Sequence, residues 1–376
     1  MDFLHFSENL FRLRREKKLT QEQRADFIGV TKAAISKWET KQSLPDLLIL
    51  PRLSSFFDIS IDDLLGYQPQ LSKEEIRRIY HSLADDFSRK PFDDVMEESR
   101  KLIKKYYSCY RFLLQIVVLW INHFMLAQDK INQQTILADA AGLCDRIISD
   151  CGETGLCNDA LCLKATICLF QNTPEQAVEI MRDLADPCSM LSQADSVLIK
   201  AYWAAGRKDE ADSFVQISTF LHLISLVDHA ASHLAVRGND PAFCRETINR
   251  TEKLIGIYRL DVLHPGSVIT FELQAAITYA QHGSKKDALE MLLQYTDHLR
   301  YLMEDEHLKL HGDSYFTGLE PWFEKLDLGS SAPRDKKIIM ESAVQVLDHP
   351  VFQNLQDEPD FQKAKKLTAM IGGSYE

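Results

Sequence analysis

Residues 19–39 read LTQEQRADFIGVTKAAISKWE, and this stretch decides the fold of the first part of the chain. Thr20 and Gln23 have the spacing of a capping box, in which each side chain satisfies a free backbone N–H, so a helix is predicted to begin there. Gly29 predicts a tight turn after it, because glycine adopts backbone angles that other residues resist. Thr31 then caps a second helix. Two short helices across such a turn are typical of a DNA-binding motif.

The second helix of this pair carries the predicted contacts with DNA. In such motifs it enters the major groove with its N-terminal residues toward the bases. Its outer side presents Thr31, Lys32, Ala33, Ser36 and Lys37. Ala33 is small enough to contact a thymine methyl, and the two lysines suit guanine or phosphate. Ala34, Ile35 and Trp38 are left to pack inward or at the edge.

Charge is distributed unevenly along the chain. The formal net charge is −12, yet residues 12–41 hold nine Lys or Arg and four Asp or Glu. A basic island on an acidic body suits docking on phosphates by one face only. The alternative is a helix-turn-helix that makes protein contacts alone, and the local positive charge favours DNA over it.

This region resembles the Xre and phage-repressor family of helix-turn-helix domains. The residues that carry the match are Leu13–Lys17, Leu19–Gln23, Ile28–Thr31, Ile35–Glu39, Leu44–Asp46 and Phe57–Gly66. The resemblance implies five short helices, with helix four over 46–57. It also implies that Gln21 and Thr31 anchor phosphates, that residues 32, 33, 36 and 37 face bases or backbone, and that Arg14 and Glu39 form an internal ion pair. Lys41, just beyond the second helix, completes the predicted DNA-binding set.

Three residues depart from the family pattern. Arg24 stands where the family has leucine, so either its stem covers the edge of the core while its head reaches water, or it adds a phosphate contact. Lys41 replaces a glycine and is expected to hold a strained turn. Pro51 falls within helix four, which either starts later or bends there.

The rest of the chain predicts an all-α protein of several parts, because a single core stops growing near ~250–300 residues. The segment 67–70 is a short linker after Gly66. We therefore predict a DNA-binding domain over 1–68, a helical repeat domain over 71–327 and C-terminal capping helices over 328–376. Strand-like alternation is nearly absent.

An internal repeat is visible in the helical part. Tyr202-x3-Gly206-x4-Ala211 matches Tyr279-x3-Gly283-x4-Ala288, and Cys168-x3-Asn172-x4-Ala177 is a weaker copy. Gly or Asn suits a left-handed helix end, and the small Ala suits close helix packing. Ala177 and Ala211 lie 34 residues apart, which is the period of tetratricopeptide repeats. These segments resemble that family, whose helix pairs stack into an α-solenoid; an ordinary helical bundle is the alternative.

A repressor-like domain joined to a tetratricopeptide-like domain resembles the layout of bacterial peptide-pheromone regulators. The resemblance implies a homodimer whose solenoid binds an oligopeptide or other small effector. Candidate effector-binding residues are polar groups within apolar helices: Tyr106, Tyr110, Asn122, His123, His222 and His229. For each of them a satisfied core or surface polar group is the alternative. His222, His229 and His233 span about 16 Å on one helix, too far for one ion, so no metal site is predicted.

Other functions find little support in the sequence. There is no phosphate-binding glycine loop, nucleophile elbow or metalloprotease motif, so neither an enzyme nor a cofactor is predicted. No apolar run reaches the ~20 residues of a membrane span, and a cytoplasmic location is expected. The prediction is a dimeric, sequence-specific regulator that binds double-stranded DNA and is gated by a ligand. The alternative is a DNA-targeted scaffold whose repeat domain binds a partner protein.

Overall fold

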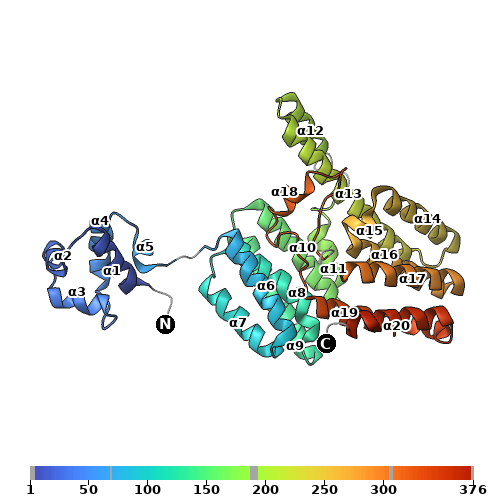
Figure 1. Cartoon of the computed structure of the whole chain (residues 1–376), viewed down its shortest axis with the longest axis horizontal. Helices are drawn as coiled ribbons and strands as arrows, with labels where there is room; N and C mark the ends of the chain where they lie inside the picture. The colour runs from blue at the N-terminus through green and yellow to red at the C-terminus, as the bar shows by residue number, and fades with distance from the viewer. Residues whose placement is uncertain (1–4, 68–69, 187–193, 305–307, 374–376) are drawn as a thin grey trace. The chain divides into compact units, whose positions relative to one another are not determined.

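The computed structural model describes residues 5–67, 70–186, 194–304 and 308–373. It divides into two compact units (Figure 1). The N-terminal unit comprises residues 1–72 with 104–109, and the helical unit comprises 73–103 with 110–376. The predicted linker falls partly on residues 68–69, which lie outside the described residues. All the regular elements of the described chain are helices, as predicted, and its β structure is limited to one isolated bridge between Lys309 and Ser331.

The N-terminal unit has the five predicted α-helices. They are α1 (Phe6–Glu16), α2 (Gln21–Ile28), α3 (Lys32–Glu39), α4 (Leu50–Phe57) and α5 (Ile61–Leu65). Their apolar faces share one core that includes Leu10, Ile28, Ile35 and Leu53. Helix four does not begin at residue 46 but later, which is one of the two outcomes expected from Pro51. Residues 47–49 form a 3-10 turn, and α4 begins at Leu50 with Pro51 in its first turn, where a missing N–H costs nothing.

Local capping residues set the geometry of α2 and α3. Thr20 and Gln23 form the predicted capping box, and Gly29 closes α2 with φ +81°. The hydroxyl of Thr31 accepts the backbone N–H of Ala34 at the start of α3. Because a left-handed residue ends one helix two positions before the next cap, the turn between the two helices is short and fixed.

The helical unit continues with helices joined by short breaks. They are α6 (Lys73–Arg89), α7 (Phe92–Lys105), α8 (Tyr110–His123), α9 (Lys130–Asp150), α10 (Thr154–Phe170), α11 (Pro174–Met181), α12 (Ala194–Ala204), α13 (Lys208–Val236), α14 (Pro241–Tyr258), α15 (Leu260–Leu263), α16 (Pro265–Gln281), α17 (Lys285–Leu302), α18 (Leu319–Phe323), α19 (Lys336–Val346) and α20 (Pro359–Gly373). Most consecutive helices of this unit pack against each other as hairpins. Such local packing is what a repeat architecture requires.

The sequence repeat corresponds to one recurring helix connection. Asn172, Gly206 and Gly283 all have positive φ, at 58°, 76° and 73°. In each copy the next residue donates its N–H to the carbonyl five positions back, at 2.8, 3.0 and 2.9 Å respectively, which is the Schellman motif. The three repeat alanines, Ala177, Ala211 and Ala288, are all buried. The predicted breaks and close-packing positions are therefore confirmed, while membership of the tetratricopeptide family stays a prediction.

The long helix α13 is apolar and also contributes to the core of the helical unit. Among the described helices it is the one whose length and composition would allow it to cross a membrane, a feature that the sequence analysis did not single out. Its buried residues Phe220, Val227 and Leu234 belong to the same apolar core as α14, α16 and α17. These residues form the buried side of the helix, while Leu221, Leu226 and Val236 are exposed.

Candidate nucleic-acid interface

Helix α3 separates its side chains into a core face and a solvent face. Ile35 and Trp38 are buried in the core of the unit. Thr31, Lys32, Ala33 and Lys37 are exposed, and Ser36 is half-buried. The ammonium of Lys32 lies 3.6 Å from the carboxylate of Glu22, but both side chains are largely exposed, so this pair is weak. The solvent face therefore offers two cations around the small Ala33, as a helix that enters the major groove requires.

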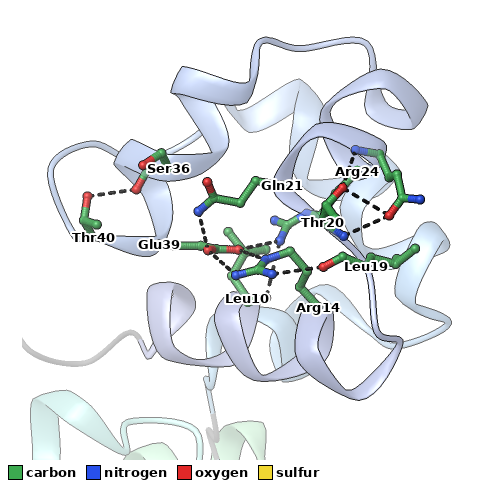
Figure 2. A network of polar contacts seen from close by, with 10 residues as sticks. Leu10, Arg14, Leu19, Thr20, Gln21, Arg24, Ser36, Glu39 and Thr40 are labelled. Carbon is green, nitrogen blue, oxygen red and sulfur yellow. Dashed lines mark hydrogen bonds and ion pairs between the residues drawn. The ribbon is translucent and has the colours of Figure 1, made fainter.

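A buried carboxylate locks α3 to the rest of the unit. Arg14 donates from Nε and Nη2 to the two oxygens of Glu39 at 2.6 and 2.9 Å, which confirms the predicted ion pair (Figure 2). Arg14 also donates to the carbonyl of Leu19 at 3.0 Å. The Glu39 side chain is only 3% exposed. Bidentate geometry fixes direction as well as distance, so this pair orients α3 relative to α1.

Arg24 lies inside the core, and both sequence-based interpretations of it are wrong. Its side chain is 0% exposed, its Nη1 lies 3.2 Å from Glu39 Oε1, and its guanidinium lies 5.2 Å from the centre of the Phe57 ring. Its Nε and Nη2 are buried without a hydrogen-bond partner in the structure. The leucine position of the family is a core position, so a residue placed there is drawn inward, and Glu39 supplies the charge that lets an arginine occupy it.

The charged groups of this cluster shift each other's pKa values. Burial alone would raise the pKa of Glu39, but the hydrogen bonds from Arg14 and Gln21 and the charges of both arginines lower it below its ordinary value. Burial lowers the pKa of Arg24 to about 10, although the charge of Glu39 opposes this. Glu39 is therefore ionised at neutral pH and holds the arginines in place.

The remaining predicted DNA-binding residues lie beside α3. Gln21, which the resemblance assigned to phosphate, donates its amide to Glu39 at 2.8 Å, so it also belongs to the internal network. Lys41 has φ +62°, which confirms a non-glycine residue in a left-handed turn. Its ammonium lies 2.7 Å from the exposed Glu8 carboxylate, a pair that solvent and salt weaken.

Comparison with known proteins addresses the same segment. A family model described as helix-turn-helix matches residues 10–64. The chain is 38% identical over 72 residues to the prophage-derived regulator YonR of Bacillus subtilis, described as an uncharacterized HTH-type transcriptional regulator, and the match covers 67% of that protein. The chain belongs to the helix-turn-helix family of transcriptional regulators. This membership agrees with the sequence-based identification of the N-terminal unit.

Other relatives of this helix-turn-helix regulator match over the same part. The HTH-type transcriptional activator BcrR of Enterococcus faecalis is 37% identical over 84 residues, which is 21% of this chain and 41% of that protein. The uncharacterized HTH-type regulator YqaE of Bacillus subtilis is 43% identical over 60 residues, which is 16% of this chain and 52% of that protein. The chain thus spans about half the length of these two relatives. No solved structure matches the chain.

Arg24→Leu is expected to stabilise the N-terminal unit of this regulator. The change removes a buried cation with two unpaired nitrogens, while Arg14 still neutralises Glu39. We expect the free energy of unfolding to rise by about 1–2 kcal/mol, measured by urea denaturation. Arg15→Leu, at an exposed position of α1, is the control and should change it by less than about 0.5 kcal/mol. If Arg24→Leu instead lowers the free energy of unfolding, the contacts of the Arg24 guanidinium contribute more stability than the burial of its charge costs.

Acid is expected to destabilise the same unit through Glu39. A carboxylate whose pKa is lowered by folding contributes stability above its ordinary pKa of 4.5 and loses that contribution as the pH falls through the folded value. Unfolding free energies measured between neutral pH and acid should therefore decrease below about pH 4.5. In the Arg24→Leu background, where only Arg14 would lose its counter-charge, Glu39→Gln should flatten this dependence. Glu8→Gln, which removes only an exposed pair, should leave most of it.

The predicted effector-binding residues lie on or next to two helices, α8 and α13. Asn122 and His123 lie together at the end of α8, Tyr110 begins that helix, and Tyr106 precedes it. His222 and His229 are exposed on α13, and His222 lies 3.2 Å from Asp195 of α12. Among the described residues, no group of three His, Cys, Asp or Glu side chains could hold a metal ion.

Asn122 and His123 have structural partners. His123 is buried and stacks on Phe87 with ring centroids 4.5 Å apart, and burial lowers its pKa to about 4. Asn122 donates to the carbonyl of Val118 and accepts from Nε of Arg334 at 3.1 Å. The partner of Asn122 lies in the C-terminal part of the chain, residues 328–376, which was predicted to form capping helices.

Proposed function

We propose that this chain is a cytoplasmic, sequence-specific DNA-binding regulator that reads the major groove with α3. The observation that carries the proposal is the solvent face of α3, with Ala33 between Lys32 and Lys37, held in place by a buried Arg14–Glu39 pair. The family implies DNA binding, and the strongly acidic remainder of the chain disfavours wrapping by any other face. The proposal includes no catalytic step.

We further propose that the regulator acts as a homodimer. One helix-turn-helix contacts one half-site, so two copies related by a two-fold axis would read an inverted repeat. The helical unit would bind a peptide or small effector and favour one spacing of the two DNA modules. Such gating requires that the effector bind one arrangement more tightly than the other.

Selection of bound duplexes from a random DNA pool tests this function. Full-length chain is incubated with the pool at near-physiological salt, because affinity without a stated salt concentration cannot be interpreted. An enriched inverted repeat supports specific dimeric binding, and an enriched single half-site contradicts the dimer alone. Failure to enrich any sequence, with and without cell extract as a source of effector, contradicts sequence-specific binding.

A partner-protein scaffold is the second candidate, and one helix favours it. None of the described residues of α12 is buried, although it packs beside α13, and it exposes Val197, Leu198 and Trp203. Exposed apolar patches of this kind are typical of protein-interaction sites. Cross-linking in cells followed by purification tests this candidate: a scaffold should capture a partner that Trp203→Asp loses while DNA binding is unchanged.

A further inference from the structure

The segment that joins α18 to α19, residues 324–335, is held in an unusual way. It is not helical, and none of its side chains is fully buried. Segments that fold for structural reasons normally anchor themselves with buried apolar residues. This one, which we call the return segment, has a single partly buried apolar side chain packed on the core, that of Leu326. Its other contacts are polar and reach α6 and α8, whose sequence positions are more than two hundred residues earlier.

Helix α6 contacts the backbone of the return segment. Lys73, Arg77 and His81 recur every four residues and so share one side of the helix. Lys73 donates to the carbonyl of residue 325 at 3.0 Å. The ring Nε2 of His81 lies 3.2 Å from the carbonyl oxygen of residue 328. Arg77 donates to the carbonyls of residues 324, 326 and 327 at 2.9, 2.7 and 3.3 Å. These donors recognise main-chain carbonyls, which every peptide carries.

Helix α8 contacts the side chains of the segment. Arg111 and Gln115 each donate to one oxygen of the Asp327 carboxylate, at 3.0 and 3.2 Å. About two turns further along the same helix, the side chain of Asn122 accepts a hydrogen bond from Arg334 at 3.1 Å. The carbonyl oxygen of the Gln115 amide is buried without a hydrogen-bond partner in the structure. The α8 contacts therefore select an acidic residue and leave one acceptor unused.

Glycine is favoured at one position of the segment. Gly329 has φ +67°, and a Cβ placed on it would lie 3.1 Å from Cζ of Arg77. Both its backbone angle and this close approach disfavour a side chain there. A ligand that replaced the segment would need the same small residue two positions after its carboxylate.

We propose that this side of α6 and α8 is a binding site for a short peptide with free backbone carbonyls, an acidic side chain and a glycine, and that the return segment occupies it in cis. The inference rests on the proposed gating of the regulator by an effector. Polar contacts hold most of the segment, with Leu326 as its one apolar contact with the core, so a second peptide that offers the same carbonyls and carboxylate can exchange with it.

Displacement of the return segment by a peptide would break a connection between two groups of helices. Within the described part of the helical unit, the helix pairs that pack extensively lie either within α6–α11 or within α12–α20. The return segment connects these two groups through the contacts above. Its tether gives it an effective concentration in the millimolar range, so a free peptide competes poorly until the segment is weakened.

The test uses a fluorescein-labelled synthetic peptide with the sequence of residues 323–335, FEKLDLGSSAPRD. Binding to the full-length chain is followed by fluorescence anisotropy. In the chain, Asp327→Ala removes the contacts of the return segment with Arg111 and Gln115. We expect it to tighten peptide binding at least about tenfold, because the competitor in cis is weakened. Adding Arg111→Ala should reverse this gain, since the aspartate of the peptide then loses its partner. Arg250→Ala, an exposed residue of α14, is the matched control.

A milder chain variant and an altered peptide complete the test. Asp327→Asn is a milder change in the chain and should give a smaller gain in the same direction if Asp327→Ala fails to fold. A peptide with alanine in place of the aspartate that corresponds to Asp327 should bind at least about tenfold more weakly to the Asp327→Ala chain. Equal binding of both peptides, or no gain in either folded variant, would overturn the proposal. The assay contains no DNA, so its failure leaves the duplex selection, and thus the proposed DNA-binding function, untouched.

Discussion

Glu39→Leu is expected to unfold the N-terminal unit while the helical unit stays folded. The carboxylate of Glu39 accepts hydrogen bonds from Arg14, Gln21 and Arg24, and its removal leaves two guanidinium groups in the core without a counter-charge. Breaking a buried pair in this way costs about 3–5 kcal/mol. That loss is comparable with the whole stability of a domain of this size.

Hydrogen exchange of the full-length chain measures this effect unit by unit. Amides within residues 5–67 should lose their protection, and those of α13–α17 should keep it. Glu16→Leu is the matched control, because Glu16 pairs with Arg12 on the exposed side of α1 and that pair is worth less than about 1 kcal/mol. Full protection of residues 5–67 in Glu39→Leu would contradict the role assigned to the buried carboxylate.

The Arg24→Leu background sharpens this prediction. With Arg24 replaced, only Arg14 remains to be stranded by the loss of Glu39, so Glu39→Leu should cost less there than in the natural chain. The difference between the two costs is the coupling between Arg24 and Glu39. A coupling near zero would mean that Arg24 is accommodated by the Phe57 ring rather than by the carboxylate.

The N-terminal unit could be predicted from sequence because its signals are local. The capping box at Thr20, the left-handed Gly29 and the cap at Thr31 each act within a few residues, and all three are confirmed. The repeat breaks at Asn172, Gly206 and Gly283 were found for the same reason. A hydrogen bond between neighbouring residues needs no knowledge of the tertiary fold.

Features that depend on distant partners were missed. Arg24 is buried because Glu39, fifteen positions later, comes to it from α3, and no local pattern shows that pairing. The return segment lies 212 to 253 positions from the α6 and α8 residues that it contacts. Its own sequence has no apolar periodicity that would mark it. The polar stripe on α6 was detectable by its spacing of four, but an exposed helix face is the ordinary interpretation of such a stripe.

Ala33→Glu is expected to abolish sequence-specific DNA binding without changing the stability of the N-terminal unit. Ala33 is exposed on α3 between the two lysines, so the longer side chain meets no neighbour in the free protein. In a complex the added carboxylate would lie against base edges and between phosphates. Loss of a good base contact costs about 1–3 kcal/mol, and repulsion from the phosphates adds to it, so affinity for the selected duplex should fall about 100-fold or more.

Electrophoretic mobility shift with the selected duplex measures this loss. Ser55→Glu adds the same charge at an exposed position of α4 and is the matched control. If α3 reads the groove, the control should lose much less affinity than Ala33→Glu, because a charge away from the interface is screened over a Debye length of about 10 Å at 0.1 M salt. Equal losses in both variants would mean that net charge rather than α3 governs binding. Unchanged binding in Ala33→Glu would instead require another surface of the N-terminal unit to contact DNA.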